Sequence, residues 1–489
     1  MRAPFARVDD RARRSSWLVW LAGACVYFLA VLHRASLGVA GPDAIDRLGI
    51  SATELGSFVM VQLGIYAAMQ VPAGLAIDRW GPRRVLLVAT LVLGVAQTTF
   101  AFATGYPVAL AARALLGMGD AAVFIAVLRL AAMWFPRRRY AILTTATGLF
   151  GMAGNLVATV PLVIALEDYG WTRTFAITGL TSVAYALLLL RPAIAAPYRE
   201  VREPAQQPER TSRRALADVA ASWGRKETRL AFWTHQATMT PGGVISLVWG
   251  YPFLTEALGY SNAAAAGQLS LYVVATLAAS FFIGPFAGRR PGWRMPIAVT
   301  VSVGGILAVV SLVAWPGDGP PPFVVTTAFI VLALGGPASQ VAFHIARDYN
   351  PPSRISTATG LVNSGGFAGA MIAAILVGIV LDARSGTAAP TLGDYRWAIG
   401  SVAVLALAST LAMVATLLSV RIGVLDRMVR QEDVVVPVYP RWWDQTYARL
   451  SRMRVEEDDG GAAPPRDEGP DAPDDDGAAS PDDDGRSAR

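Results

Sequence analysis

The sequence is poor in charged residues and has a single cysteine. Only 16% of its 489 residues are charged and 54% are apolar, whereas about a quarter of the residues in average soluble domains are charged. The apolar residues form long runs separated by short arginine-rich segments, a layout typical of chains that cross a membrane many times. Cys25 alone cannot form an internal disulfide, so no disulfide framework is expected.

Several catalytic and nucleotide-binding patterns are also missing from the sequence. No G-x-x-x-x-G-K-[ST] loop is present to cradle the phosphates of ATP, so ATP-driven pumping is not expected. No Ser–His–Asp arrangement or metal-ligand spacing stands out among the apolar runs. We therefore expect no enzyme activity, no metal and no cofactor.

The net charge of +6 combines two regions of opposite sign. The last 34 residues, from Glu456, hold thirteen acids and three arginines, which leaves +16 for residues 1–455. This acidic segment is rich in proline and glycine, and we predict a disordered, solvated tail. The basic charge lies mostly in loops, so it indicates membrane topology and no nucleic-acid partner.

Twelve apolar runs are long enough to cross a bilayer, which takes about 20 helical residues. They predict an all-α membrane protein with twelve transmembrane helices in two six-helix bundles. The basic loop 192–228 separates bundles at 17–191 and 229–421, between terminal segments at 1–16 and 422–489. The runs lie at 17–41, 52–76, 84–105, 107–134, 141–166, 171–191, 229–254, 263–287, 294–315, 322–346, 354–381 and 395–421.

Arginines are concentrated in the loops on one side of the predicted membrane. These loops include residues 79–84, 137–139, 199–229, 289–294 and 347–354. Because cytoplasmic loops carry an excess of basic residues, we expect both termini in the cytoplasm and the chain in the cytoplasmic membrane. The expected partners are the lipid bilayer, a small-molecule substrate and protons, and we expect a monomer.

Two short similarities indicate that the chain is an internal duplication. TTATGLF at 144–150 matches STATGLV at 356–362 with an offset of 212 residues. GLAIDRWGPRR at 74–84 matches GPFAGRRPGWR at 284–294 with an offset of 210 residues. Transporters are commonly built from such repeats, with the substrate site between them near the middle of the membrane.

The segment GLAIDRWGPRR resembles the signature loop of the major facilitator superfamily, G-x-x-x-D-R-x-G-R-R. The resemblance implies a gate at which glycines allow close helix packing and Asp78 pairs with arginines. In the second copy Gly288 replaces this aspartate. RALLGMGDA, through Arg113, resembles a second family pattern, R-x-x-x-G-x-G, and the likeness covers residues 17–421. The matching residues of the gate motif are Gly74, Asp78, Arg79, Gly81, Arg83 and Arg84.

Within the superfamily, two stretches are similar to the anion:cation symporters and sugar-phosphate permeases. They are HRASLGVAGPDAIDRLGIS, which starts at His33, and GDAAVFIAVLRLAAMWFP, which starts at Gly119. The chain departs from that branch at His33, where an acid or asparagine is common, and at Asp120, where glutamate is common. It also departs at Ile125, which replaces a proline. The resemblance implies proton-coupled transport of a small organic anion of the carboxylate or sugar-phosphate class.

Arg34 lies about two-thirds along the first predicted span. An arginine at the middle of a membrane costs about 2.5–3.5 kcal/mol on insertion scales, so such residues are functional candidates. A guanidinium offers a fixed fork of donors for carboxylate or phosphate. The resemblance implies that Arg34 binds the anionic group of the substrate; internal pairing and snorkelling to the membrane surface are the alternatives.

Arg113 and Asp120 are seven residues apart, so they share one face of a helix. The resemblance implies that the acid at the Asp120 position takes part in proton coupling, together with Arg113; a static salt link between helices is the alternative. His33 is either a proton carrier or a hydrogen-bonding core residue. Tyr272, Gln340 and Asn363 are polar residues within the later spans, and we name them as candidate substrate-binding residues.

These features favour a secondary active transporter whose two bundles move about a central site. An exporter of drugs or cell-envelope metabolites with the same fold is the alternative. Such an exporter would have an apolar cavity and would tolerate replacement of Arg34.

Overall fold

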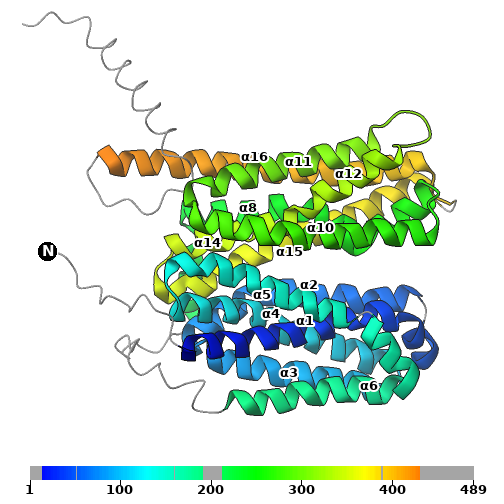
Figure 1. Cartoon of the computed structure of the whole chain (residues 1–489), viewed down its shortest axis with the longest axis horizontal. Coiled ribbons are helices and arrows are strands. Elements are labelled where there is room, and N and C mark those ends of the chain that lie inside the picture. Colours follow the sequence, from blue (N-terminus) through cyan, green and yellow to red (C-terminus); the bar gives the residue numbers. More distant parts are fainter. Residues whose placement is uncertain (1–13, 51, 159, 191–211, 387–388, 430–489) are drawn as a thin grey trace, which may run out of the picture. The chain divides into compact units, whose positions relative to one another are not determined.

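The computed structural model describes residues 14–50, 52–158, 160–190, 212–386 and 389–429, which are helices and connecting turns (Figure 1). The N-terminal half contains α1 (Arg14–Leu48), α2 (Ala52–Trp80), α3 (Pro82–Phe102), α4 (Tyr106–Trp134), α5 (Arg137–Val157) and α6 (Val160–Leu189). The C-terminal half contains α8 (Lys226–Val244), η3 (Ile245–Trp249), α9 (Gly250–Pro252), η4 (Phe253–Ala257), α10 (Asn262–Arg289), η5 (Pro291–Trp293), α11 (Arg294–Val313), α12 (Pro322–Ala333), α13 (Gly335–Ser339), α14 (Val341–Tyr349), η6 (Pro352–Arg354), α15 (Ile355–Ser385) and α16 (Leu392–Val429).

A short helix, α7 (Ser212–Trp223), precedes the second half. The rest of the predicted basic loop falls mostly outside the described residues. So do the predicted terminal segments, including the acidic tail, apart from the start of α1 and the end of α16.

The predicted all-α membrane fold is confirmed. Eleven helical stretches of the described chain are long and apolar enough to span a membrane. The remaining predicted span, 229–254, is helical from α8 to η4 and includes two π-helical turns. Its many polar side chains explain its lower hydropathy, since Thr234, His235 and Gln236 are all buried inside the protein.

The reversal between the fifth and sixth predicted spans lies at Gly170. The range Val160–Leu189 contains two helices, because Gly170 has a non-helical backbone with a φ of 73°. The hydroxyl of Thr174 donates a hydrogen bond of 2.8 Å to the carbonyl of Ala165 across this reversal. Only glycine adopts such a positive φ without strain, so Gly170 marks the division that the hydropathy pattern predicts.

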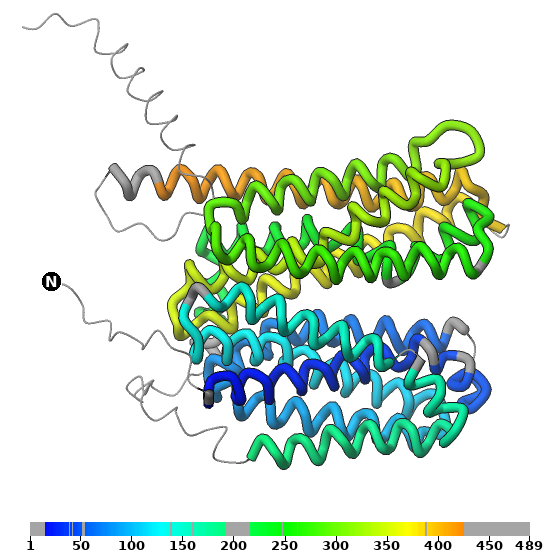
Figure 2. The backbone as a smooth tube through the Cα atoms, in the orientation of Figure 1, coloured from blue at the N-terminus to red at the C-terminus, as the bar shows by residue number. Residues whose placement is uncertain are grey.

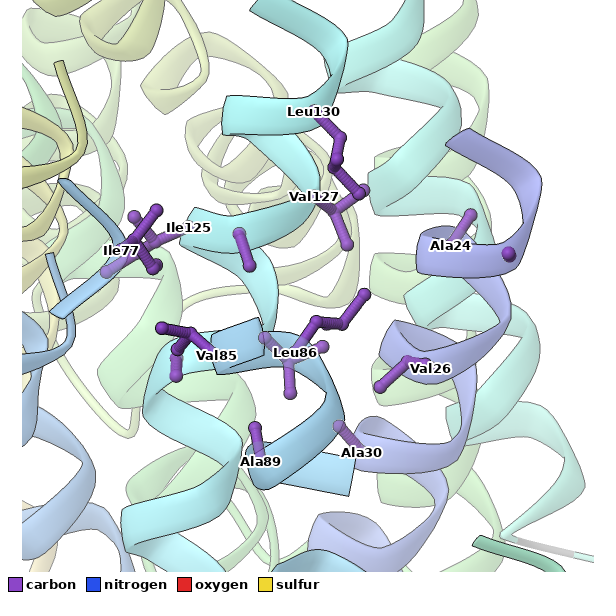
Figure 3. Packing of buried hydrophobic residues seen from close by; sticks show 14 of the residues in the cluster. Ala24, Val26, Ala30, Ile77, Val85, Leu86, Ala89, Ile125, Val127 and Leu130 are labelled. Carbon is purple, nitrogen blue, oxygen red and sulfur yellow. The ribbon is translucent and has the colours of Figure 1, made fainter. Parts of the chain in front are cut away.

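Small and branched residues fill the core of the N-terminal half (Figure 3). Ala30 of α1 and Ile125 and Val127 of α4 are completely buried, and Leu86 and Ala89 of α3 are nearly so. Alanines let the helix backbones approach closely, which favours association where lipid is as apolar as the core. Large apolar side chains such as Phe282 and Leu156 instead lie exposed on the outside.

The internal repeat appears as two equivalent helix crossings between the halves. Figure 2 shows the helices of residues 14–189 and those of residues 226–429 as two stacks. At one crossing Gly74 of α2 lies directly against the backbone of Ser356 and Thr357 at the start of α15. At the other crossing Gly284 of α10 lies against Thr145 of α5. Gly74 and Gly284 are related by the 210-residue offset, and Thr145 and Thr357 by the 212-residue offset.

The two crossings differ deeper in the membrane. Gly360 of α15 packs against the backbone carbonyl of Gln70 on α2. Its repeat equivalent, Gly148 of α5, has open space around the position of a Cβ atom and lines a cavity instead. The α2–α15 crossing is therefore tight at a depth where the α5–α10 crossing is open.

We predict that Gly360→Ala lowers the free energy of unfolding by about 1–3 kcal/mol, because the added methyl overpacks the α2–α15 crossing. The matched variant Gly148→Ala should leave it nearly unchanged. Thermal unfolding of both purified variants in detergent measures the difference. Equal destabilisation would contradict the asymmetry of the two crossings.

Candidate functional site

A cavity of about 210 Å³ lies between residues of both halves. Its walls are mainly aromatic, hydroxyl and small side chains, and no lysine, arginine or carboxylate lines it directly. It is smaller than the pockets of about 300–1,000 Å³ that hold drug-sized ligands. The lining residues are Tyr27, Tyr66, Phe124, Thr144, Thr145, Gly148, Met152, His235, Met239, Thr276, Ser280, Gly284, Gly336, Pro337, Ser339, Gln340, Asn363 and Phe367.

An ion pair joins Arg34 of α1 to Asp120 of α4 beside this cavity. Arg34 Nε is 3.1 Å from Asp120 Oδ2, and the side chains are 18% and 1% exposed. Within the described chain neither oxygen of Asp120 has another hydrogen-bond partner. Among the described residues, Arg34 is the one basic residue that forms an ion pair with it. Pairing offsets the high cost of placing each charge in the membrane interior.

Tyrosines connect the ion pair to the cavity. The Arg34 guanidinium lies 5.2 Å from the ring centre of Tyr66, and Tyr27 is a second electrostatic neighbour. Both tyrosines line the cavity, although Arg34 itself is not among the lining residues. Arg34 thus lies next to two residues of the cavity wall, and its side chain as a whole is 18% exposed.

A polar contact between the halves closes one wall of the cavity. Asn363 Nδ2 of α15 donates to Gln70 Oε1 at 2.7 Å and to Tyr66 Oη at 3.2 Å on α2. The Tyr66 ring also packs edge-on against Phe367, with 4.6 Å between the ring centres. Tyr66 therefore contacts the ion pair, the cavity and the second half at once.

The candidate substrate-binding residues from the second half occupy different places. Gln340 and Asn363 line the cavity, and Gln340 Oε1 is buried without a hydrogen-bond partner in the described chain. Tyr272 is not a lining residue: its hydroxyl lies next to Gly242, and its carbonyl accepts from the Thr276 hydroxyl. Its next-turn neighbour Thr276 lines the cavity instead.

His33 and Arg113 lie inside the N-terminal half, away from the cavity lining. His33 Nε2 is hydrogen-bonded to Ser182 Oγ of α6 at 2.7 Å. Arg113 Nη1 donates to the carbonyl of His33 at 3.3 Å, and its guanidinium lies 3.7 Å from the ring centre of Phe100. Among described residues Asp120 pairs with Arg34, and no ion pair joins it to Arg113.

Several cavity residues were missed by sequence reasoning. Tyr27 lies two helical turns before Arg34 and therefore shares its face of α1, a relation that the spacing could have revealed. Tyr66 and Phe367 were also missed, and each lies four residues from a polar residue of the contact between the halves, Gln70 and the predicted Asn363 respectively. His235 lies in the most polar span, but nothing in its local sequence distinguishes it from a core histidine.

The gate-motif residues are found at one end of the structure, where the halves touch. Asp78 Oδ2 accepts hydrogen bonds from the amide and hydroxyl of Thr357 at 2.8 and 2.7 Å, and Oδ1 accepts from the amide of Ser356 at 3.2 Å. Its described hydrogen-bond donors are thus the first turn of α15, and no described arginine forms an ion pair with it. A carboxylate at a helix N-terminus is stabilised by the free N–H groups there.

The other motif residues act within the N-terminal half or at its surface. Arg83 donates to the carbonyls of Leu189 and Leu190 at the end of α6. Gly81 has a φ of 83° at the turn between α2 and α3. Arg79 stacks on Trp80 with 5.4 Å between guanidinium and ring, and Arg84 is exposed.

A second contact joins the halves at this end. The Arg347 guanidinium of α14 lies 4.4 Å from the ring centre of Tyr140, and its Nη2 donates to the carbonyl of Phe135 at 3.5 Å. Together with Asp78 and the glycine crossings, this contact closes the end that carries the signature loop.

We predict that Arg34→Ala lowers the free energy of unfolding by about 3 kcal/mol, because it leaves Asp120 buried without its counter-charge. The double variant Arg34→Gln/Asp120→Asn should recover most of the loss, since no net charge remains. Thermal melting of the purified variants measures both effects. A double variant no more stable than Arg34→Ala would show that the pairing is not what stabilises the site.

Known proteins resemble this chain in sequence and in structure. A probable sulfoacetate transporter of Cupriavidus necator is 24% identical over 380 residues, covering 74% of this chain and 86% of that protein. A probable galactarate/D-glucarate transporter of Bacillus subtilis is 22% identical over 479 residues, covering 90% of this chain and 100% of that protein. The structure of a proton:xylose symporter bound to 6-bromo-6-deoxy-D-glucose aligns with a TM-score of 0.61 at 13% identity, covering 81% of this chain and 95% of that one.

The family model of the major facilitator superfamily matches residues 23–334, more than half of the chain. This match agrees with the helical membrane fold and the internal repeat. The chain belongs to the major facilitator superfamily of membrane transporters.

Proposed function

We propose that this transporter moves a small organic anion together with a proton by alternating access. The observation that carries the proposal is the buried Arg34–Asp120 pair beside a small cavity between the two halves. The relatives named above are described as transporters of sulfoacetate and of galactarate or D-glucarate, which are small organic anions.

The pair supports a mechanism of exchange between two anions. Arg34 has one described carboxylate partner, and a substrate anion in the cavity competes with Asp120 for the same guanidinium. When the substrate takes that place, Asp120 is left buried without a counter-charge. A proton on Asp120 removes this cost, so substrate binding and proton binding favour each other.

The contacts between the halves support a state closed at one end. The described side-chain contacts run from Asp78 and Arg347 at the signature-loop end to Tyr66 and Asn363 at the cavity. The arginine distribution supports a cytoplasmic location for the signature-loop end. Transport then requires the Asp78 and Arg347 contacts to break and equivalent contacts to form at the other end.

The size of the cavity favours a small anion over a drug. At about 210 Å³ the cavity is smaller than the pockets of about 300–1,000 Å³ that hold drug-sized ligands. Methionines and phenylalanines do line part of the wall, namely Met152, Met239, Phe124 and Phe367. Export of an apolar compound is therefore the competing outcome of the first experiment below.

Anion binding is tested by thermal unfolding with a panel of sulfoacetate, hexuronates, aldarates, sugar phosphates and apolar amphiphiles. We expect one class of organic anion to stabilise the parent by about 2.7 kcal/mol at 100 times its Kd. Arg34→Gln should remove the effect, and Arg34→Lys should weaken it, because lysine keeps the charge but loses the fork. Stabilisation by amphiphiles alone, unchanged in Arg34→Gln, would favour the exporter.

Proton coupling is tested in proteoliposomes with the anion that the panel identifies. We expect Asp120→Asn to reduce the rate of uptake driven by a pH gradient at least tenfold, while exchange of labelled for unlabelled anion persists. Exchange needs no net proton movement, so it controls for folding and binding. Gradient-driven uptake that survives in Asp120→Asn would contradict the assigned role of Asp120.

A further inference from the structure

A second cavity lies on the outer surface of the C-terminal half and is not part of the site between the halves. It is a groove of about 490 Å³ along the last turns of α10, with one residue from α11. Three exposed phenylalanines, Phe281, Phe282 and Phe286, form most of its apolar wall, and Phe282 is 75% exposed. The remaining lining residues are Ile283, Pro285, Arg289, Arg290 and Ile297.

Pro285 lies inside the part of α10 that lines the groove. A proline inside a helix has no N–H to donate, so the carbonyl of Phe281, four residues earlier, loses its usual partner. The groove is lined by phenylalanines before and after this proline.

The arginines at the end of the groove supply a positive rim. Arg289 and Arg290 are exposed, and neither takes part in an ion pair with a described carboxylate. The Arg290 guanidinium lies 5.3 Å from the ring centre of Phe286, and Trp293 packs edge-on against the same ring at 6.2 Å. The Phe286 ring therefore contacts both the Arg290 guanidinium and the Trp293 indole ring.

The spacing of these groups matches an amphiphile with a negative head. Eight residues of helix separate Phe281 from Arg289, a rise of about 12 Å along the axis. Tryptophan and arginine are the residues found at the level of lipid head groups, whereas phenylalanine lies against acyl chains. The rim is cationic and the wall apolar, so charge complementarity favours a lipid with an anionic head group over a zwitterionic one.

The internal repeat shows that the aromatic wall of the groove is specific to the second half. At the 210-residue offset, Phe281, Phe282 and Phe286 correspond to Val71, Pro72 and Ala76 in the first half. Those small residues cannot form the same aromatic wall. The basic pair is partly retained, because Arg289 corresponds to Arg79. The first half thus supplies a charge-matched control that lacks the groove.

We propose that this groove binds an anionic phospholipid, with its phosphate at Arg289 and Arg290 and an acyl chain along Phe281, Phe282 and Phe286. On the opposite side of the same helix end, Gly284 and Gly288 pack against Thr145 and Ala141 of α5. A lipid in the groove therefore presses on the helix that forms the more open of the two crossings between the halves.

The test is native mass spectrometry of the full chain in detergent, titrated with phosphatidylglycerol or phosphatidylcholine of the same acyl chains. We expect tighter retention of phosphatidylglycerol by the parent, and roughly 30-fold weaker retention by Arg289→Gln/Arg290→Gln, from roughly a fivefold factor for each lost charge. The charge-matched control Arg79→Gln/Arg84→Gln should retain the lipid like the parent, and Arg289→Lys/Arg290→Lys should largely restore it.

Two further measurements separate a lipid site from simple charge attraction. Phe281→Ala/Phe282→Ala should also weaken phosphatidylglycerol retention, and glycerol phosphate, which has no acyl chains, should not displace phosphatidylglycerol from the parent. Equal retention of both lipids by the parent would overturn the proposal, because the groove would then be ordinary lipid contact. Equal losses in the Arg289/Arg290 and Arg79/Arg84 variants would also overturn it.

Discussion

The ion pair between Arg34 and Asp120 is the interaction on which the rest of this structure depends. Either charge alone is costly in a membrane interior. The cost is offset because α1 and α4 hold the two groups 3.1 Å apart. The close packing of alanines between α1, α3 and α4 makes that approach possible. The core of the first half thus sets the geometry of the charged site.

This ion pair can exchange partners because the Asp120 carboxylate has few other hydrogen bonds to hold it in place. Asp120 accepts no described hydrogen bond beyond its contact with the arginine, and Arg34 reaches the cavity wall through Tyr66. Tyr66 in turn is bound by Asn363 from the second half. A movement of the ion pair therefore acts, through Tyr66, on the crossing of α2 and α15. Asp78 holds this crossing together at the signature-loop end. This chain of contacts physically links the charged site to the closed end.

The sequence carried enough information for the helices, the repeat and the family, because each of these rests on local period or on short matched segments. Gly74 and Gly284 pack as equivalents, as the 210-residue offset indicates. The interaction partners of the charged residues could not be predicted from the sequence in the same way. Arg113 and Asp120 share a helix face, yet two turns separate them by about 10 Å along the axis, and the partner of Asp120 comes from α1. Asp78 likewise finds its donors 278 and 279 residues further on, at the first turn of α15. Such contacts depend on how helices are placed together, which no local pattern encodes.

In the proposed transport cycle, a substrate anion replaces Asp120 at Arg34, and Asp120 then takes a proton. The most direct measurement is the number of protons taken up from a weakly buffered detergent solution when the purified protein binds a saturating organic anion. Binding should take up close to one proton per bound anion near neutral pH, and none in Asp120→Asn with binding retained. Anion binding to the parent without proton uptake at any pH would contradict this cycle.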